Sequence, residues 1–124
     1  MYRMRNEENI MKFSVHQMIP SHRKYLAEYK SDEYFQVSFY GKVPPSLFLA
    51  HYSKVCEIIA EDLNEVFEIG NIGPEEKITR IDRMHSISVG DAIRVEEGPE
   101  MGYIYIVKPT GFERFHTSRE LEVA

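Results

Sequence analysis

Two stretches of this sequence carry side chains that suit the binding of a phosphate group. Arginine with nearby hydroxyl and aromatic groups is what a phosphate-bearing ligand or an acidic protein surface requires. The first of these stretches contains Arg80, Arg83, His85, Ser86 and Ser88.

The second stretch lies beyond a predicted hairpin, at residues 108–119, and is locally positive in an acidic chain. Its basic residues are Lys108, Arg114, His116 and Arg119. If the strands pair in sequence order, both stretches converge at one end of the sheet, and we expect a ligand-binding site there. The competing interpretation is a set of solvated charges that discourage strand-to-strand aggregation at sheet edges.

The segment "RMHSISVGDAIRV" leaves the same choice open. Ser86 and Ser88 fit the polar face of an edge strand without any function. Gly90 breaks the pleat and predicts a bulge or a tight turn. Asp91 is then expected to accept hydrogen bonds from the turn backbone. Turn geometry therefore explains this motif adequately.

The motifs of familiar catalytic and cofactor sites are missing. The sequence contains no GxxxxGK[ST], GxGxxG, GxSxG or HExxH. Its five histidines lack metal-ligand spacing, although a zinc site assembled across the fold stays open. Cys56 lies in a predicted apolar strand, which favours a buried, inert thiol over a nucleophile. We expect no catalytic residue, no metal and no cofactor.

Length and composition indicate one soluble domain. The chain has 124 residues, of which 43% are hydrophobic and 28% charged, and its formal net charge is -5. This charge argues against sequence-independent nucleic-acid binding, which needs a basic face. No stretch is long and apolar enough for a membrane span or a secretory signal, and a single cysteine suits a reducing cytoplasm. Residues 1–10 are expected to be a poorly ordered extension of a single domain at 11–124.

Hydrophobic spacing predicts the elements of the first half. Alternation predicts a strand over 13–19, which Pro20 ends, and Ser21 fits the N-cap of a short helix. Alternation again predicts a strand over 34–42. A turn at 46–50 and a strand over 52–59 are expected next.

The clearest helix signal follows this strand. Asp62 and Glu65 have capping-box spacing, and Gly70 is the expected helix end. Residues 71–84 are predicted to be an exposed loop with one helical turn from Pro74.

The last part of the chain is predicted to be strands joined by turns. The expected strands are 86–89, 92–97, 103–107 and 113–116, with turns at 98–102 and 108–112. The fold class is α+β: a mostly antiparallel sheet with one or two helices packed on one face.

The order of these pieces also forms a recognisable pattern over about residues 52–116. An acidic-Leu helix ending in Asn precedes a His-Ser-hydrophobic-Ser-Val-Gly-Asp segment and an aromatic strand ending in Gly-Phe. The pattern resembles a group of small uncharacterised proteins of bacteriophages, plasmids and conjugative elements, the YodL-like group. The matching positions are Asp62, Leu63, Phe67, Asn71, His85, Ser86, Ser88, Val89, Gly90, Asp91, Gly111 and Phe112.

The resemblance implies a gene context and no chemistry. In that context we expect a non-enzymatic accessory protein that counteracts host defence by sequestering a nucleotide signal or a defence protein. The alternative is a small nucleotide-processing hydrolase with an unrecognised site. Exposed strand edges and a high aromatic content would also suit a homo-oligomer.

Overall fold

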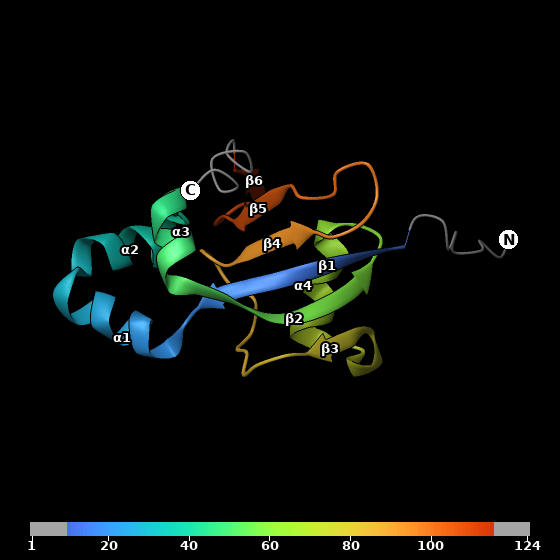
Figure 1. Ribbon diagram of the computed structural model, residues 1–124, viewed down its shortest axis with the longest axis horizontal. Coiled ribbons are helices and arrows are strands. Elements are labelled where there is room, and N and C mark those ends of the chain that lie inside the picture. The colour runs from blue at the N-terminus through green and yellow to red at the C-terminus, as the bar shows by residue number, and fades with distance from the viewer. Residues whose placement is uncertain (1–9, 116–124) are drawn as a thin grey trace, which may run out of the picture.

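The computed structural model describes residues 10–115 as an open antiparallel sheet with helices on both of its faces (Figure 1). The six strands lie in the order β3-β2-β1-β4-β5-β6. They are β1 (Met11–Met18), β2 (Tyr52–Ala60), β3 (Ile78–Arg80), β4 (Ala92–Val95), β5 (Ile104–Val107) and β6 (Phe112–Arg114). The helices are α1 (Pro20–Tyr29), α2 (Ser31–Tyr40), α3 (Pro45–His51) and α4 (Leu63–Ile72), and Glu75–Lys77 forms one 3-10 turn. None of the helices in the described part of the chain has the length and apolar content that crossing a bilayer requires.

The α+β class and the antiparallel sheet are confirmed, but the expected number and placement of helices are wrong. Four helices are present, and they divide between the two faces of the sheet. Neighbouring strand residues show this division, because successive side chains point to opposite faces. Ile93 packs with Val66 and Ile69 of α4, whereas Ala92 packs with residues of α1, α2 and α3.

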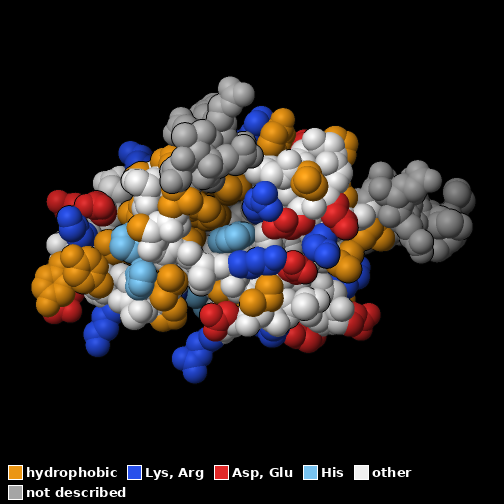
Figure 2. Space-filling view, viewed as in Figure 1, with side chains coloured by type: hydrophobic (Ala, Val, Ile, Leu, Met, Phe, Trp, Pro, Cys, Tyr) orange, Lys and Arg blue, Asp and Glu red, His pale blue; other side chains and the backbone are white. Residues whose placement is uncertain are grey.

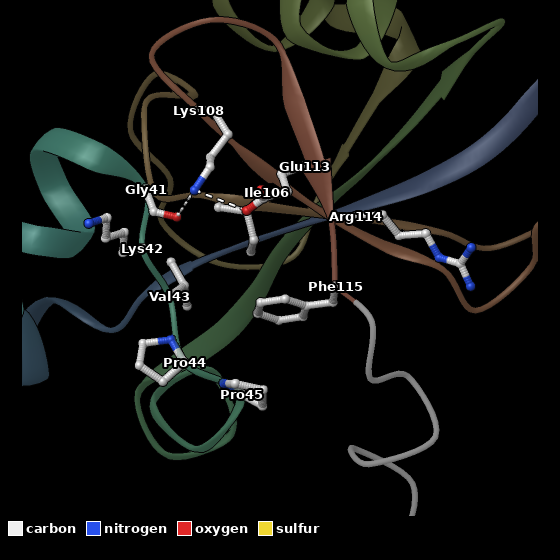
Figure 3. A pocket seen from close by; sticks show the side chains of 10 residues that line it. All are labelled: Gly41, Lys42, Val43, Pro44, Pro45, Ile106, Lys108, Glu113, Arg114 and Phe115. Atoms are coloured by element: carbon white, nitrogen blue, oxygen red, sulfur yellow. Dashed lines mark hydrogen bonds and ion pairs between the residues drawn. The ribbon is translucent and has the colours of Figure 1, made fainter.

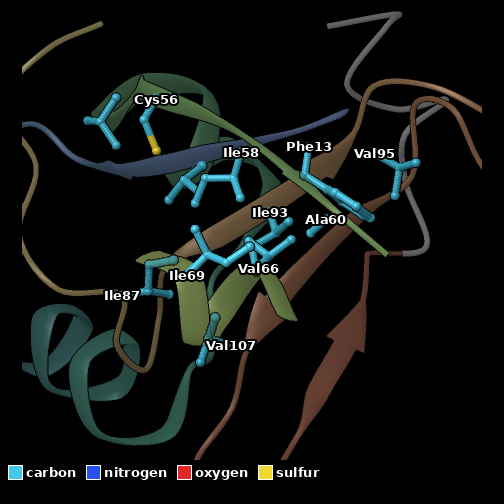
Figure 4. Close-up of a cluster of buried hydrophobic side chains, with 12 residues drawn as sticks. Phe13, Cys56, Ile58, Ala60, Val66, Ile69, Ile87, Ile93, Val95 and Val107 are labelled. Carbon is cyan, nitrogen blue, oxygen red and sulfur yellow. The ribbon is translucent and has the colours of Figure 1, made fainter. Parts of the chain in front are cut away.

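The larger core lies between α4 and the sheet (Figure 4). Phe13, Val15 and Ile58 are buried in it beside Ile93 and Val66. Cys56 is also buried here, as expected, and burial raises the pKa of its thiol to about 11. A thiol held in its protonated form is a poor nucleophile, so Cys56 acts as core material.

The smaller core lies between the opposite face of the sheet and the three helices at one end of it. Leu26 of α1, Val37 of α2, and Leu47 and Phe48 of α3 meet Ile104 and Ile106 there. This core fixes α1 and α2 beside the ends of β1 and β2, where the cavities described below lie.

The strand predicted over 34–42 is wrong, because this segment is α2. Its alternation placed Phe35, Val37 and Phe39 on one buried face, yet only Val37 is buried, and Phe39 is 60% exposed. Asp32 and Glu33 in the first turn suit the positive end of a helix dipole. The helix ends at Gly41, whose φ of 68° is left-handed. Strand propensity is overridden here by tertiary context.

The turn predicted at 46–50 is also a helix, α3, which begins with proline at its first position. It leads directly into β2, and that strand confirms the prediction over 52–59. The helical turn expected from Pro74 is present, but β3 was not foreseen and pairs with β2.

The cap of α4 is confirmed. The Glu65 backbone N–H donates to Asp62 Oδ1 at 2.8 Å, and the Glu61 N–H donates to Glu65 Oε1 at 2.7 Å. The expected helix end at Gly70 is wrong: α4 continues to Ile72, and Gly73 caps it.

Replacing Asp62 with alanine should lower the free energy of unfolding by about 1 kcal/mol, because one N–H of the first turn loses its acceptor. Chemical denaturation measures the change. The exposed Glu76, replaced with alanine, is the matched control and should change stability little. An equal effect of both substitutions would contradict the capping role.

Candidate functional site

The segment between β3 and β4 crosses one end of the sheet without regular secondary structure. The strand expected over 86–89 is therefore wrong. Ile87 is buried, Val89 is only half-buried, and Ser86 and Ser88 are exposed. Side chains from three other parts of the chain form hydrogen bonds with backbone groups of this segment. We call the segment the wired loop (81–91).

Asn71 of α4 holds the centre of the wired loop. The Ile87 N–H donates to Asn71 Oδ1 at 2.6 Å, and Asn71 Nδ2 donates to the Ile87 carbonyl at 3.2 Å. Gly70 beside it has no side chain because a Cβ there would lie 2.3 Å from Ile87 Cδ1. The Gly-Asn pair at the end of α4 is thus a docking point for the loop.

Gln17 of β1 holds both ends of the same turn. Its Oε1 accepts from the His85 N–H at 3.1 Å, and its Nε2 donates to the His85 carbonyl at 2.9 Å and to Asp91 Oδ2 at 3.0 Å. Asp91 Oδ2 also accepts from the Ser88 N–H at 2.9 Å. Gln17 is 1% exposed, so these bonds are shielded from water.

Asp91 is a buried carboxyl group whose pKa is raised to about 6. Burial disfavours the charged form and dominates, while the Ser88 N–H, His85, Gln17 and Arg23 act in the opposite direction. Asp91 therefore exchanges its proton in the range where histidine ordinarily does so.

As pH rises from about 4 to about 7, the free energy of unfolding of the wild type should fall relative to that of the Asp91→Asn variant. A carboxyl whose pKa is raised on folding stabilises the folded state below its unfolded pKa, and this contribution is lost as pH rises through the folded value. The expected relative loss is about 2 kcal/mol, measured by denaturation at several pH values. The exposed Asp32, replaced with asparagine, is the control. The difference in free energy of unfolding between this variant and the wild type should stay nearly constant over the same pH range. A pH-independent difference for Asp91→Asn as well would contradict the raised pKa.

Two adjacent cavities open between the wired loop, α1 and the ends of β1 and β2. They have volumes of about 510 and 450 Å³, and their walls share Met18, Arg23 and His85. We call them together the twin cleft. Tyr34, Tyr52, Ser88 and Asp91 line only the first cavity, and Gln17, Arg83 and Met84 only the second.

Arg23 is the central cation of the twin cleft. It is half-buried, and within residues 10–115 its guanidinium group makes neither an ion pair nor a hydrogen bond. Arg83, at the wall of the second cavity, also forms no ion pair within this range. A half-buried guanidinium that forms no ion pair or hydrogen bond keeps its five donors available for an anion.

His85 and Tyr52 add polar groups whose orientation is fixed by hydrogen bonds. His85 Nδ1 lies 2.7 Å from the Ser86 carbonyl, so it carries the proton, and Nε2 is the acceptor in the neutral ring. The Tyr52 hydroxyl donates to the Gly90 carbonyl at 2.5 Å, and burial raises the pKa of the phenol.

Comparison with protein-family models, curated proteins and solved structures gave no match.

The predicted meeting of the two basic stretches is confirmed only for Ser88 and Lys108, which line one cavity of about 460 Å³, and it is wrong for the arginines. Arg80 lies on β3 and Arg114 on β6, at opposite edges of the sheet. Arg80 is also neutralised by Glu75, with nitrogen–oxygen distances of 2.6 and 2.8 Å. Of the predicted residues, Arg83, His85 and Ser88 line the twin cleft, whereas Ser86 does not. His116 and Arg119 lie outside the described residues.

Another cavity, of about 410 Å³, lies beside β6 and includes Arg114 in its wall (Figure 3). The Arg114 side chain points away from the other labelled side chains, and its guanidinium carbon lies 3.4 Å from the centroid of the Tyr103 ring. Lys108 in this cavity donates to the Gly41 carbonyl at 3.0 Å and pairs with Glu113 at 3.1 Å. Arg114 and Lys108 are thus already engaged by other groups, which makes this cavity a poorer anion site than the twin cleft.

The face of the sheet away from α4 carries interspersed acidic and basic side chains over β1, β2 and β4 (Figure 2). Ser14 Oγ lies there 2.9 Å from His16 Nε2 and donates to Glu96 Oε2 at 2.5 Å. Ser14 has no exposed surface, so a substrate cannot reach its hydroxyl. Burial lowers the pKa of His16 to about 4 and keeps the ring neutral. This cluster closes a polar network and offers no nucleophile.

Sequence reasoning missed Arg23, Gln17 and Tyr52 as site residues. Arg23 lies in the predicted short helix and Gln17 in the strand predicted over 13–19, and neither was among the predicted site residues. No local pattern marks either residue, because their role depends on β1 lying in the middle of the sheet.

Proposed function

We propose that the protein binds a small phosphate-bearing ligand of the nucleotide class in the twin cleft and sequesters it without converting it. The proposal rests on Arg23, a half-buried cation that lines both cavities and whose side chain forms no ion pair or hydrogen bond within residues 10–115. Arg83 supplies a second cation at the same wall.

The remaining lining suits the other parts of a nucleotide. Tyr34, Tyr52 and Met18 offer aromatic and apolar surface for a base. Asp91 and His85 Nε2 offer acceptors for sugar hydroxyls or exocyclic amines. The cavity volumes fall in the usual range of roughly 300–1,000 Å³ for small-molecule sites.

The biological role in this proposal is counter-defence by a phage or mobile-element accessory protein acting in the cytoplasm. It rests on the resemblance of the "HSISVGD" segment to proteins of such elements. Sequestration of a nucleotide signal suits the twin cleft. Blocking of a host defence protein is the other form of this role, and a homo-oligomer is compatible with both.

A thermal-shift screen with ADP-ribose and cyclic dinucleotides tests the binding proposal. A ligand that binds the folded state raises Tm. Arg23→Gln should weaken binding at least about tenfold, because a charge-assisted hydrogen bond contributes about 1.5–3 kcal/mol. Arg114→Gln is the matched control and should bind as wild type does. Equal weakening by both variants, or no shift with any compound, would contradict the proposal.

A hydrolase is the second candidate, and one observation favours it. Gln17 holds His85 and Asp91 together at one cavity, and His85 Nε2 is free to act as a base. Mass spectrometry of the ligand after release by denaturation separates the two functions. An unchanged ligand supports sequestration, and an altered product supports hydrolysis.

A further inference from the structure

His22 of α1 and His51 of α3 form a cluster that the proposed function does not use. Their Nδ1 atoms lie 3.1 Å apart, and the ring centroids are 5.2 Å apart with an interplanar angle of 79°. Both residues are half-buried, and histidine side chains reach the surface in the region of α1 and α3 (Figure 2). Solvent therefore has access to the pair.

The backbone fixes the distance between the two histidines. The Ile19 N–H donates to the His51 carbonyl at 2.8 Å, and the Arg23 N–H donates to the Ile19 carbonyl at 2.8 Å. The first turn of α1 is thus bonded directly to the last residue of α3. The two imidazoles are brought together by these main-chain bonds and do not depend on each other for their placement.

The separation of 3.1 Å also matches two nitrogen ligands on one metal ion. With metal–nitrogen bonds of about 2.0–2.1 Å, two ligands at tetrahedral or square angles lie about 2.9–3.4 Å apart. In the metal-free pair one ring must donate its Nδ1 proton to the other, whereas a metal uses the lone pairs of both Nδ1 atoms.

We propose that His22 and His51 form a two-histidine site for a divalent late transition-metal ion, bound through both Nδ1 atoms. Imidazole ligands suit copper, zinc and nickel, and affinity among these is highest for Cu²⁺. Within residues 10–115 no set of three or more His, Cys, Asp or Glu side chains is placed to hold a metal. Water completes the coordination, and the site is exchangeable, unlike a closed structural zinc site.

Calorimetric titration with Zn²⁺ and electron paramagnetic resonance with Cu²⁺ test this site. Wild type should bind one equivalent, and the Cu²⁺ spectrum should show coupling to two imidazole nitrogens. His22→Gln and His51→Gln should each weaken binding at least about tenfold, because each removes one of the two protein ligands.

His16→Gln is the matched control, because His16 Nε2 lies 2.9 Å from Ser14 Oγ and takes no part in the pair, and it should bind as wild type does. Circular dichroism confirms that each variant folds. Unchanged affinity in His22→Gln and His51→Gln, or loss of affinity in His16→Gln alone, would overturn the proposal. The readout is metal binding, so its failure leaves the nucleotide-binding proposal to its own test.

Discussion

Replacing Gly90 with alanine should lower the free energy of unfolding by about 3 kcal/mol or more. Gly90 has a φ of 93°, which side chains rarely adopt. A Cβ at this position would lie 2.7 Å from the Val37 carbonyl oxygen of α2 and 3.0 Å from Val37 Cγ1. The nearest obstacle is backbone, so the wired loop must move away from α2, and the Tyr52 hydroxyl then loses its acceptor. Overpacking of this kind costs about 1–3 kcal/mol beyond the backbone strain.

Gly111→Ala is the matched control for this substitution. Gly111 also has a positive φ, of 78°, but nothing lies within 4 Å of a Cβ built there. Chemical denaturation should therefore show only the backbone strain, about 1–2 kcal/mol. Equal losses of free energy of unfolding in the two variants would contradict a close contact between the wired loop and α2.

Replacing Gln17 with methionine should lower the free energy of unfolding by about 3 kcal/mol. Methionine keeps nearly the same shape but leaves the His85 N–H and carbonyl without their partners and removes a donor from Asp91. A buried polar group left unpaired costs about 1–3 kcal/mol, and bonds to charged groups cost more. Denaturation of the variant measures this loss.

Gln36→Met is the control, since Gln36 is exposed on α2 and its change should alter stability by less than about 0.5 kcal/mol. Amide hydrogen exchange adds a local readout. Exchange of the His85 and Ser88 amides should accelerate in Gln17→Met. Unchanged protection of these amides would contradict the role of Gln17 as the anchor of the wired loop.

Two parts of the second half of the fold, the hairpin before β5 and the start of α4, were predictable from local signals. Alternation over 103–107 and the turn residues at 98–102 predicted β5 and the hairpin before it. The Asp62–Glu65 pair predicted the start of α4, because a capping box is a local interaction. The end of α4 was not predictable, since Gly70 is required by its contact with Ile87, which is remote in sequence.

The predicted convergence of Arg80 and Arg114 is wrong because of the strand order. The expectation assumed pairing in sequence order, but β1 lies between β2 and β4 and is paired with both. This insertion moves β3 and β6 to opposite edges, which separates Arg80 from Arg114. It also buries Gln17, because β1 has a neighbouring strand on each side.

The contacts of the wired loop explain why "HSISVGD" alternates polar and apolar residues although it does not form a strand. Ile87 fills the core, Gly90 permits close approach to α2, and Asp91 accepts bonds from the turn. The expectation that Asp91 bonds the turn backbone is confirmed. The same contacts hold His85 and Ser88 at the edge of the twin cleft, so the structural and ligand-binding interpretations of the segment are compatible.

The most direct test of the account is an NMR titration of the ¹⁵N-labelled protein with ADP-ribose and a cyclic dinucleotide. Binding in the twin cleft predicts that the largest amide shift changes fall on Arg23 and on residues 83–91. Changes centred on residues 108–114 at β6, or no change with either compound, would contradict the claim that this cleft holds a phosphate-bearing ligand.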